Sequence, residues 1–128
     1  MTALVAVALG GALGGACRYL ATRALDRHLS TAFPWATFLV NMSGAFLAGS
    51  LAQWLTHHGD GQSPAGLLLL VGFLGSYTTV SSWSLQTLAL MRQSLYGHAL
   101  ANLLLTTLAG LIAVVAGVQL ARVLGVWL

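Results

Sequence analysis

Residues 67–82 read LLLLVGFLGSYTTVSS, and this stretch decides the fold. Its first half, residues 67–74, is apolar and favours a helix, whereas residues 75–82 are mostly Gly, Ser, Thr and Val, which are weak helix formers. At mid-membrane depth such a sequence allows a local unwinding, whose backbone must be buried in protein or face water or an ion. It also allows an ordinary helix whose hydroxyls bond back to its own carbonyls. Periodicity alone leaves both readings open.

The composition around this stretch is that of an integral membrane protein. Of the 128 residues, 58% are hydrophobic and only 5% are charged, whereas soluble domains carry about 25% charged residues. A disordered chain needs low hydrophobicity and high charge, so disorder is excluded as well. We therefore expect the lipid bilayer to be the first partner of this chain.

The same composition excludes several kinds of chemistry. There is no Glu, and Asp26 and Asp60 both lie in polar surroundings, so no carboxylate pair is available for general acid/base catalysis. Cys17 is the only cysteine, and the four His lack ligand spacing on a common helix face, which argues against a protein-made metal site. The formal charge of +3 is spread thinly along the chain, which does not indicate nucleic-acid binding. We therefore expect that this chain is not an enzyme.

Four stretches are long and apolar enough to cross a bilayer, which takes about 20 residues. They cover residues 2–25, 35–55, 64–91 and 96–123, and polar residues separate them. Residues 1–9 carry no Lys or Arg, so the first span is read as retained and not as a cleaved signal peptide. The sequence thus predicts an all-α membrane protein with one four-helix domain over residues 1–128. A chain this short cannot enclose a wide pore alone, which favours an oligomer.

The orientation in the membrane is weakly specified. Arg23, Arg27 and Arg92 fall on one side of the predicted bundle and Arg122 on the other. Three arginines against one is a slight positive-inside bias. Such a chain can insert in both orientations, which would allow an antiparallel dimer.

Few polar residues lie inside the spans, and nearly all are neutral. Arg18 is the exception: it either faces the bundle interior or a water cavity, or it snorkels to the interface. Asn41 and the neighbouring Thr37 in the second span either line a path or make interhelical hydrogen bonds. Asn102 and Thr106 form a second polar stripe in the fourth span. Neutral N–H and O–H donors with no fixed negative charge favour an anion path over a cation or proton path.

Small residues mark the first span as a packing helix. Gly10-x-x-x-Gly14 and Gly11-x-x-x-Gly15 repeat the spacing of close helix contacts. We interpret these glycines as positions where another backbone approaches.

Three ordered motifs resemble the fluoride channels called Fluc or CrcB. Residues 10–19, GGALGGACRY, are similar to the family's GGxxGxxxRY. Residues 34–49, PWATFLVNMSGAFLAG, resemble PWGTLxVNxxGxFxxG, and residues 72–84, GFLGSYTTVSSWS, resemble GFxGGxTTFSTFS. The resemblance covers nearly the whole chain, and the fourth span matches only loosely.

The resemblance implies an antiparallel, dual-topology homodimer in the inner (plasma) membrane, with a broken third helix and two fluoride pores. These would passively export fluoride that entered the cell as HF. It implies one structural Na⁺ at the dimer centre, held by the backbone carbonyls of Gly75 and Thr78, and it matches Arg18 to the family's arginine. The physics is consistent, since fluoride is strongly hydrated and a pore must replace its water with donors. The expected pore-lining residues are Thr37, Asn41, Val80, Ser81, Trp83, Ser84, Asn102 and Thr106.

The third-span motif departs from the family in three places. Val80 and Trp83 stand where the family has two Phe, and Gln86 replaces an acidic residue. Trp83 keeps an aromatic edge and adds an indole N–H, whereas Val80 offers neither. The departures leave room for a heterodimer in which a paralogue supplies missing parts.

Two other classes of protein share some of these features. Small multidrug transporters have a similar length and four spans, but they need a membrane-embedded Glu, which this chain lacks. A non-transporting membrane subunit would use its polar stripes only to hold helices together.

Overall fold

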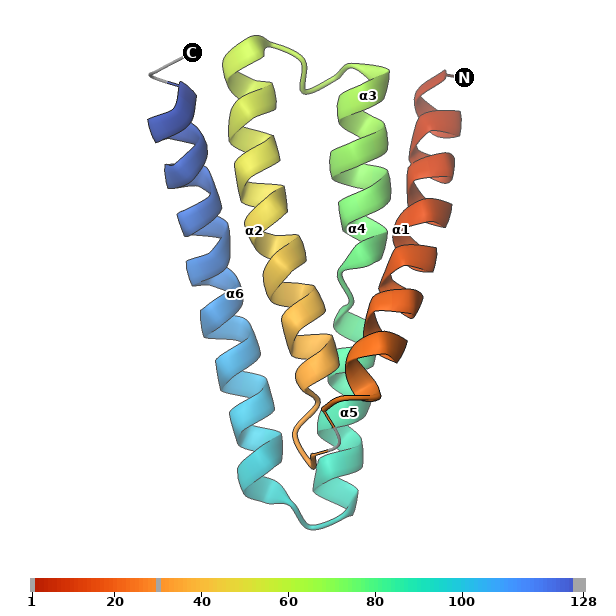
Figure 1. Cartoon of the computed structure of the whole chain (residues 1–128), viewed down its shortest axis with the longest axis vertical. Helices are drawn as coiled ribbons and strands as arrows, with labels where there is room; N and C mark the ends of the chain where they lie inside the picture. Colours follow the sequence, from red (N-terminus) through yellow and green to blue (C-terminus); the bar gives the residue numbers. More distant parts are fainter. Residues whose placement is uncertain (1, 30, 126–128) are drawn as a thin grey trace.

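The computed structural model describes residues 2–29 and 31–125, and all regular structure in these ranges is helical (Figure 1). Two long helices come first, and a third span of several segments and a final long helix follow. Their bounds are α1 Thr2–Asp26, α2 Trp35–His58, α3 Pro64–Gly66, η1 Leu67–Leu74, α4 Gly75–Tyr77, α5 Val80–Arg92 and α6 Tyr96–Gly125.

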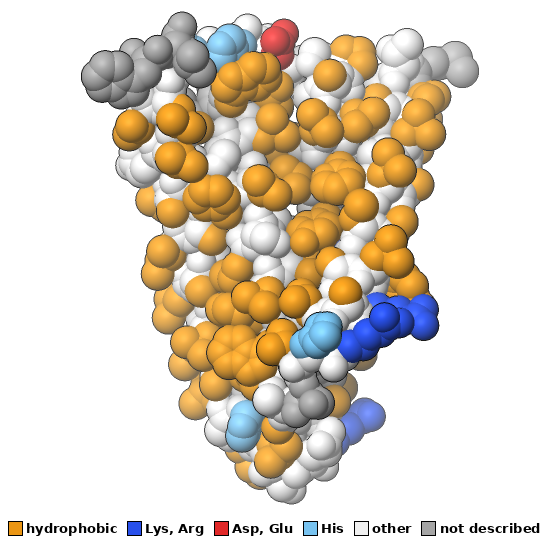
Figure 2. Space-filling model, in the orientation of Figure 1, with side chains coloured by type: hydrophobic (Ala, Val, Ile, Leu, Met, Phe, Trp, Pro, Cys, Tyr) orange, Lys and Arg blue, Asp and Glu red, His pale blue; other side chains and the backbone are white. Residues whose placement is uncertain are grey.

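Within the described residues, four helical stretches are long and apolar enough to cross a membrane, as the sequence predicted. They are Thr2–Asp26, Trp35–His58, Pro64–Arg92 and Tyr96–Gly125. Their outer surface is apolar too, with Leu4 77% and Ile112 69% exposed, and hydrophobic side chains cover most of the visible face in Figure 2. An exposed apolar surface of this extent belongs in lipid. The chain is a multi-pass membrane protein.

The spans stand side by side in the order α6, α2, third span, α1 (Figure 1). Packing is closest between α2 and α6 and between α1 and η1. Both pairs meet through glycine. A Cβ on Gly49 would strike the Val114 carbonyl of α6, and one on Gly117 would strike the Phe46 carbonyl of α2. Without side chains in the way, the two backbones of each pair can touch.

The first-span glycines divide into two faces. Gly10 and Gly14 are buried against η1, where an added Cβ would meet the carbonyl oxygens of Leu68 and Phe73. Their interpretation as close-packing positions is confirmed. Gly15 has no such neighbour within 4 Å, so only one of the two GxxxG faces makes the contact.

Several helix ends follow simple local rules. α2 stops at Gly59, whose φ of 72° is the left-handed conformation that glycine adopts at low cost. The third span starts at Pro64, where a missing N–H is harmless, and the Ser63 hydroxyl accepts from the N–H of Gly66.

The third span changes its winding along its length. The eight residues of η1 form the wider π-type turns, although their Leu-rich sequence predicts an ordinary helix. After the single turn of α4, Thr78 and Thr79 have extended backbones with ψ of 158° and 121°. α5 then begins at Val80. In Figure 1 the two extended residues are the thin link between α4 and α5.

Candidate functional site

The side chain of Asn41 in α2 pairs with the backbone of Thr79. The Thr79 N–H donates to Asn41 Oδ1 at 2.8 Å, and Asn41 Nδ2 donates to the Thr79 carbonyl at 3.0 Å. Both backbone groups of an extended residue within a membrane span are satisfied in this way. One amide replaces the helical hydrogen bonds that Thr79 lacks.

The hydroxyl groups of Thr78 and Thr79 make hydrogen bonds at the end of α4 and at the start of α5. The Thr78 hydroxyl and N–H both donate to the Leu74 carbonyl, at 3.0 and 3.1 Å. The Thr79 hydroxyl accepts from the Ser82 N–H at 3.1 Å, which caps the start of α5. This is the role that Thr favours at a helix start, and it explains why the Thr78-Thr79 doublet stands here.

The carbonyl groups at the end of α4 are left available. Within the described residues, the carbonyl oxygens of Gly75 and Thr78 accept no backbone hydrogen bond across this junction. The Thr79 N–H, which would bond to Gly75 in a helix, donates to Asn41, and the Ser82 N–H, which would bond to Thr78, donates to the Thr79 hydroxyl. Thr78 is the midpoint of the 29-residue span Pro64–Arg92. The free carbonyls therefore lie half-way along the span.

An open groove of about 420 Å³ runs beside the junction, between α2, the third span and α6. It brings together six of the residues expected to form the site, and α1 contributes nothing to it. Thr79 and mostly small or apolar residues from α2, η1 and α6 form the rest of its wall. The expected site residues in the groove are Asn41, Gly75, Thr78, Val80, Trp83 and Thr106.

A second polar cluster joins α5 to α6. Asn102 is only 1% exposed, and its Nδ2 donates to the Thr87 hydroxyl at 2.8 Å and to the Trp83 carbonyl at 3.4 Å. The Trp83 indole N–H donates to the Asn102 carbonyl at 3.0 Å, and the Thr106 hydroxyl to Asn102 Oδ1 at 3.3 Å. We call these four residues the α5–α6 clasp. The side-chain donors of the clasp all bond to acceptors within the clasp.

A third polar contact ties α5 to α2. Gln86 Nε2 donates to the Thr37 hydroxyl at 2.8 Å, and Thr37 is 4% exposed. Gln86 Oε1 is buried and has no hydrogen-bond partner among the described residues. Gln86 thus satisfies one end of its amide and leaves the other as a buried acceptor.

The other expected site residues lie outside the groove lining. Ser81 and Ser84 are exposed, and their hydroxyls bond locally, to the Thr79 hydroxyl and the Val80 carbonyl. Arg18 is half-buried on α1, a helix that the groove does not touch. The expected residues therefore divide between the groove and the clasp, which share Trp83 and Thr106, while Thr37, the two serines and Arg18 lie outside both.

Sequence reasoning missed two residues that matter here. Thr79 carries the backbone groups that Asn41 binds, and Thr87 anchors Asn102. The Thr doublet next to weak helix formers was a usable signal for the first. The i+4 spacing of Trp83 and Thr87 was a signal for the second, since it puts both on one face.

Comparison with known proteins places the chain in a family. A family model described as CrcB-like protein, Camphor Resistance (CrcB), matches residues 5–118. The chain belongs to the CrcB family. A CrcB relative from Bradyrhizobium diazoefficiens, named fluoride-specific ion channel FluC 2, is 42% identical over 98% of this chain and 93% of its own length. One from Caulobacter vibrioides, named fluoride-specific ion channel FluC, is 40% identical over 95% of this chain and 97% of its own length.

This membership confirms the resemblance drawn from the three motifs. It also confirms that the chain is not an enzyme, because its CrcB relatives are named as ion channels. Alignment over nearly the whole length leaves no span of this CrcB chain without a counterpart.

Proposed function

We propose that this protein is a fluoride-specific ion channel of the cell's inner membrane. The names of the relatives support the ion, and the four apolar spans support the membrane. The observation that carries the proposal is the Thr78–Thr79 junction beside Asn41. Non-helical backbone at the middle of a membrane span is tolerated only where it is buried in protein or lines a water-filled path. The resemblance implies that flux is passive and exports fluoride that enters as HF, and the groove lining contains no carboxylate that could carry a coupled proton.

The groove suits an anion by what lines it. It contains no acidic side chain, so nothing there repels a negative charge. Asn41 donates one of its two amide hydrogens to Thr79 and keeps the other, which can replace one water of a hydrated fluoride. The ring edge of Trp83 adds a positive partial charge on the same wall.

One chain alone supplies too few donors for a strongly hydrated ion. The Trp83 indole N–H and the Thr106 hydroxyl are both engaged inside the α5–α6 clasp, and Val80, 73% exposed, offers none. The groove is open along its length. We infer that a second, antiparallel copy covers it and completes the lining, which the weak arginine bias of the sequence permits. A paralogue is the alternative occupant.

The free carbonyls fit a structural Na⁺ at the centre of such a dimer. Hard cations take oxygen ligands, and unwound backbone and half-helix C-termini provide them in broken membrane helices. Gly75 and Thr78 end the first half of the third span, and both line the groove that the second copy would cover. These carbonyls would hold the ion, whose fixed positive charge would favour an anion nearby.

The test of transport is fluoride efflux from liposomes that contain only the purified chain, followed with a fluoride electrode. We expect release well above empty liposomes and little chloride release. No fluoride release from a folded dimer would sink the homodimeric channel and leave the heterodimer or the non-transporting subunit. Fluoride release that returns when a paralogue is added would identify the heterodimer.

The Na⁺ site has a separate test in Gly75→Leu. A Cβ at Gly75 has its nearest neighbour, the Leu70 carbonyl, at 4.0 Å, so a single chain has room for a side chain. We expect the variant to remain helical but to lose the dimer and the Na⁺-dependent gain in thermal stability. Gly97→Leu is the control, since a Cβ there meets nothing within 4 Å. An unchanged dimer that still responds to Na⁺ would rule out this site.

A further inference from the structure

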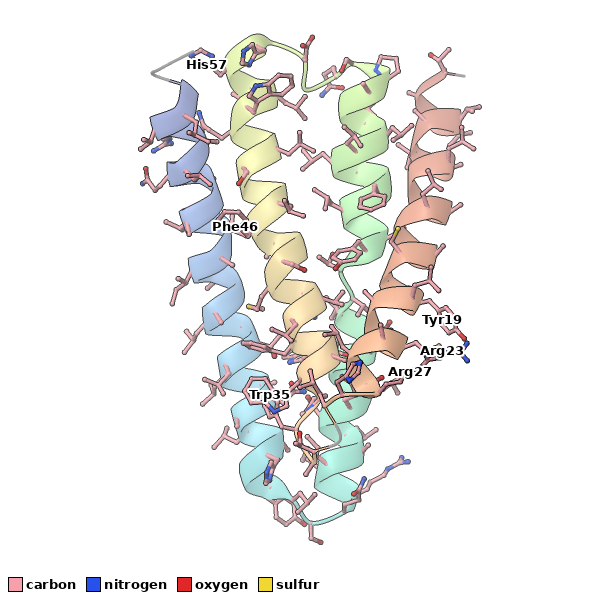
Figure 3. The ribbon with its side chains drawn as sticks, viewed as in Figure 1. Tyr19, Arg23, Arg27, Trp35, Phe46 and His57 are labelled. Atoms are coloured by element: carbon pink, nitrogen blue, oxygen red, sulfur yellow. The ribbon has the colours of Figure 1, made fainter. Side chains whose placement is uncertain are left out.

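A cationic patch lies on the outer face of α1 and on the turn that follows it, at the Asp26 end of the helix. Tyr19, Arg23 and Arg27 recur every four residues and are all exposed. Figure 3 shows the tips of Tyr19 and Arg23 together, away from the bundle, with Arg27 one turn further along. In Figure 2 blue arginine side chains gather at this edge, below the orange apolar surface.

The patch is a concave surface and not three separate side chains. A shallow groove of about 460 Å³ is lined by Tyr19, Thr22, Arg23, Asp26 and Arg27. Arg23 Nη1 donates to the Tyr19 hydroxyl at 3.2 Å, which fixes that guanidinium beside the ring. Each guanidinium has five N–H donors, so most of them stay available to an outside acceptor.

The position of the patch indicates a ligand from the membrane. The helix face that carries it lies opposite the buried Gly10 and Gly14, so it turns away from η1. Next to the patch the same side of α1 exposes Ala12 and Ala16, and beyond the middle of the span it exposes Leu9 and Val5, at 56% and 54%. An arginine pair at a span end, continuous with an apolar strip, matches a lipid: the headgroup meets the cations and the acyl chain lies along the strip.

We propose that Tyr19, Arg23 and Arg27 form a binding site for the phosphodiester headgroup of an anionic membrane lipid. Arg binds phosphate through paired N–H donors, which suits this headgroup. Two arginines and Asp26 give the patch a net charge of +1, so a singly charged headgroup neutralises it. α1 lines no part of the groove between α2, the third span and α6. A second copy that covers this groove therefore leaves the lipid site open.

The experiment is native mass spectrometry of the detergent-solubilised full chain with dioleoylphosphatidylglycerol or dioleoylphosphatidylcholine. We expect the wild-type chain to retain the anionic lipid preferentially. Because one arginine near the membrane surface contributes about a fivefold gain in anionic-lipid affinity, Arg23→Gln with Arg27→Gln should lower phosphatidylglycerol binding by at least about fivefold. Binding of phosphatidylcholine should not change.

Arg92→Gln is the matched control, an exposed arginine in the last turn of α5 at the same end of the bundle. An equal loss of phosphatidylglycerol in this control, or no loss in the double variant, would overturn the site. A third arm adds excess glycerol 3-phosphate, which carries the charge without acyl chains. Displacement of the lipid by this compound would overturn the lipid assignment in favour of soluble phosphates. None of these measurements depends on fluoride transport.

Discussion

The two halves of the third span hold to their neighbours by opposite means. η1 lies against α1 through glycines, with backbone on backbone. Thr79 and α5 are tied to α2 and α6 by side-chain hydrogen bonds from Asn41, Gln86 and the α5–α6 clasp. In a membrane neither half gains from the hydrophobic effect, so close packing and interhelical hydrogen bonds are the forces that remain. The chain uses packing where its winding is continuous and hydrogen bonds where it is interrupted.

The packed half should be the more sensitive to added volume. Gly14→Ala would drive a methyl group into the Phe73 carbonyl, which belongs to backbone and cannot rotate away. We expect about 3 kcal/mol of destabilisation or more, measured by thermal unfolding in detergent. Gly15→Ala, one residue along and free of contacts within 4 Å, should be neutral or stabilising by up to about 1 kcal/mol. Equal effects at both positions would refute packing as the reason.

The hydrogen-bonded half should fail when its central amide is removed. Asn41→Leu leaves the Thr79 N–H and carbonyl without partners in an apolar setting, which should cost about 2–4 kcal/mol and abolish fluoride flux. Unfolding and liposome efflux check the two effects. Thr56→Val is the control on the same helix, because among the described residues the Thr56 hydroxyl bonds only to the Ala52 carbonyl of its own helix. If flux is lost while stability holds, Asn41 acts on the ion and not through Thr79.

The α5–α6 clasp should give a smaller effect. Asn102→Ala removes the side-chain bonds to Thr87, Trp83 and Thr106, and Trp83→Phe removes the indole donor together with one ring of the side chain. Interhelical hydrogen bonds of this kind contribute about 0.6–1.7 kcal/mol each in a membrane protein. We expect Asn102→Ala to lower unfolding stability by about 1–2 kcal/mol and Trp83→Phe by less. Thr107→Val, whose hydroxyl bonds only within α6, should change nothing; an equal loss there would show that the clasp is not special.

Val80→Phe should have the smallest effect on stability, because Val80 is 73% exposed and lines the groove. The change restores the aromatic residue that related channels carry at this place. We expect unchanged unfolding and equal or higher fluoride efflux. A complete block of efflux would mean that the ion path near Val80 is arranged differently.

Much of the fold could be predicted from sequence because hydropathy and length act locally. The four spans and the Gly10 and Gly14 contact depend on spacing within a few turns of chain. The partners of polar groups could not be predicted, since a side chain inside a membrane bonds to whichever neighbour the packing brings near. Asn41 was expected either to line a path or to bond between helices; it lines the groove and also bonds to Thr79, 38 residues away, a partner that the sequence did not identify. Asn102 was likewise expected in the lining and lies within the clasp.

The winding of residues 67–74 was not foreseen for a related reason. Leu-rich sequence has a high helix propensity but does not distinguish i→i+4 from i→i+5 bonding. The contact with α1, in which Gly72 lies against the Val7 carbonyl, is a tertiary contact. A local sequence pattern does not show which helix will pack against these residues.

The pairing of Asn41 with Thr79 also sets an order of events during synthesis. A chain emerges from the ribosome N-terminus first, so the amide is already in the bilayer when the interrupted span arrives. The extended residues find their partner as they enter the lipid and need not wait. α5, in contrast, enters before α6 exists. The Thr87 hydroxyl already donates to the Trp83 carbonyl within α5, but the Trp83 indole N–H lacks its acceptor until Asn102 follows. The last residues to be made therefore complete the hydrogen bonds of a helix that is already in the membrane.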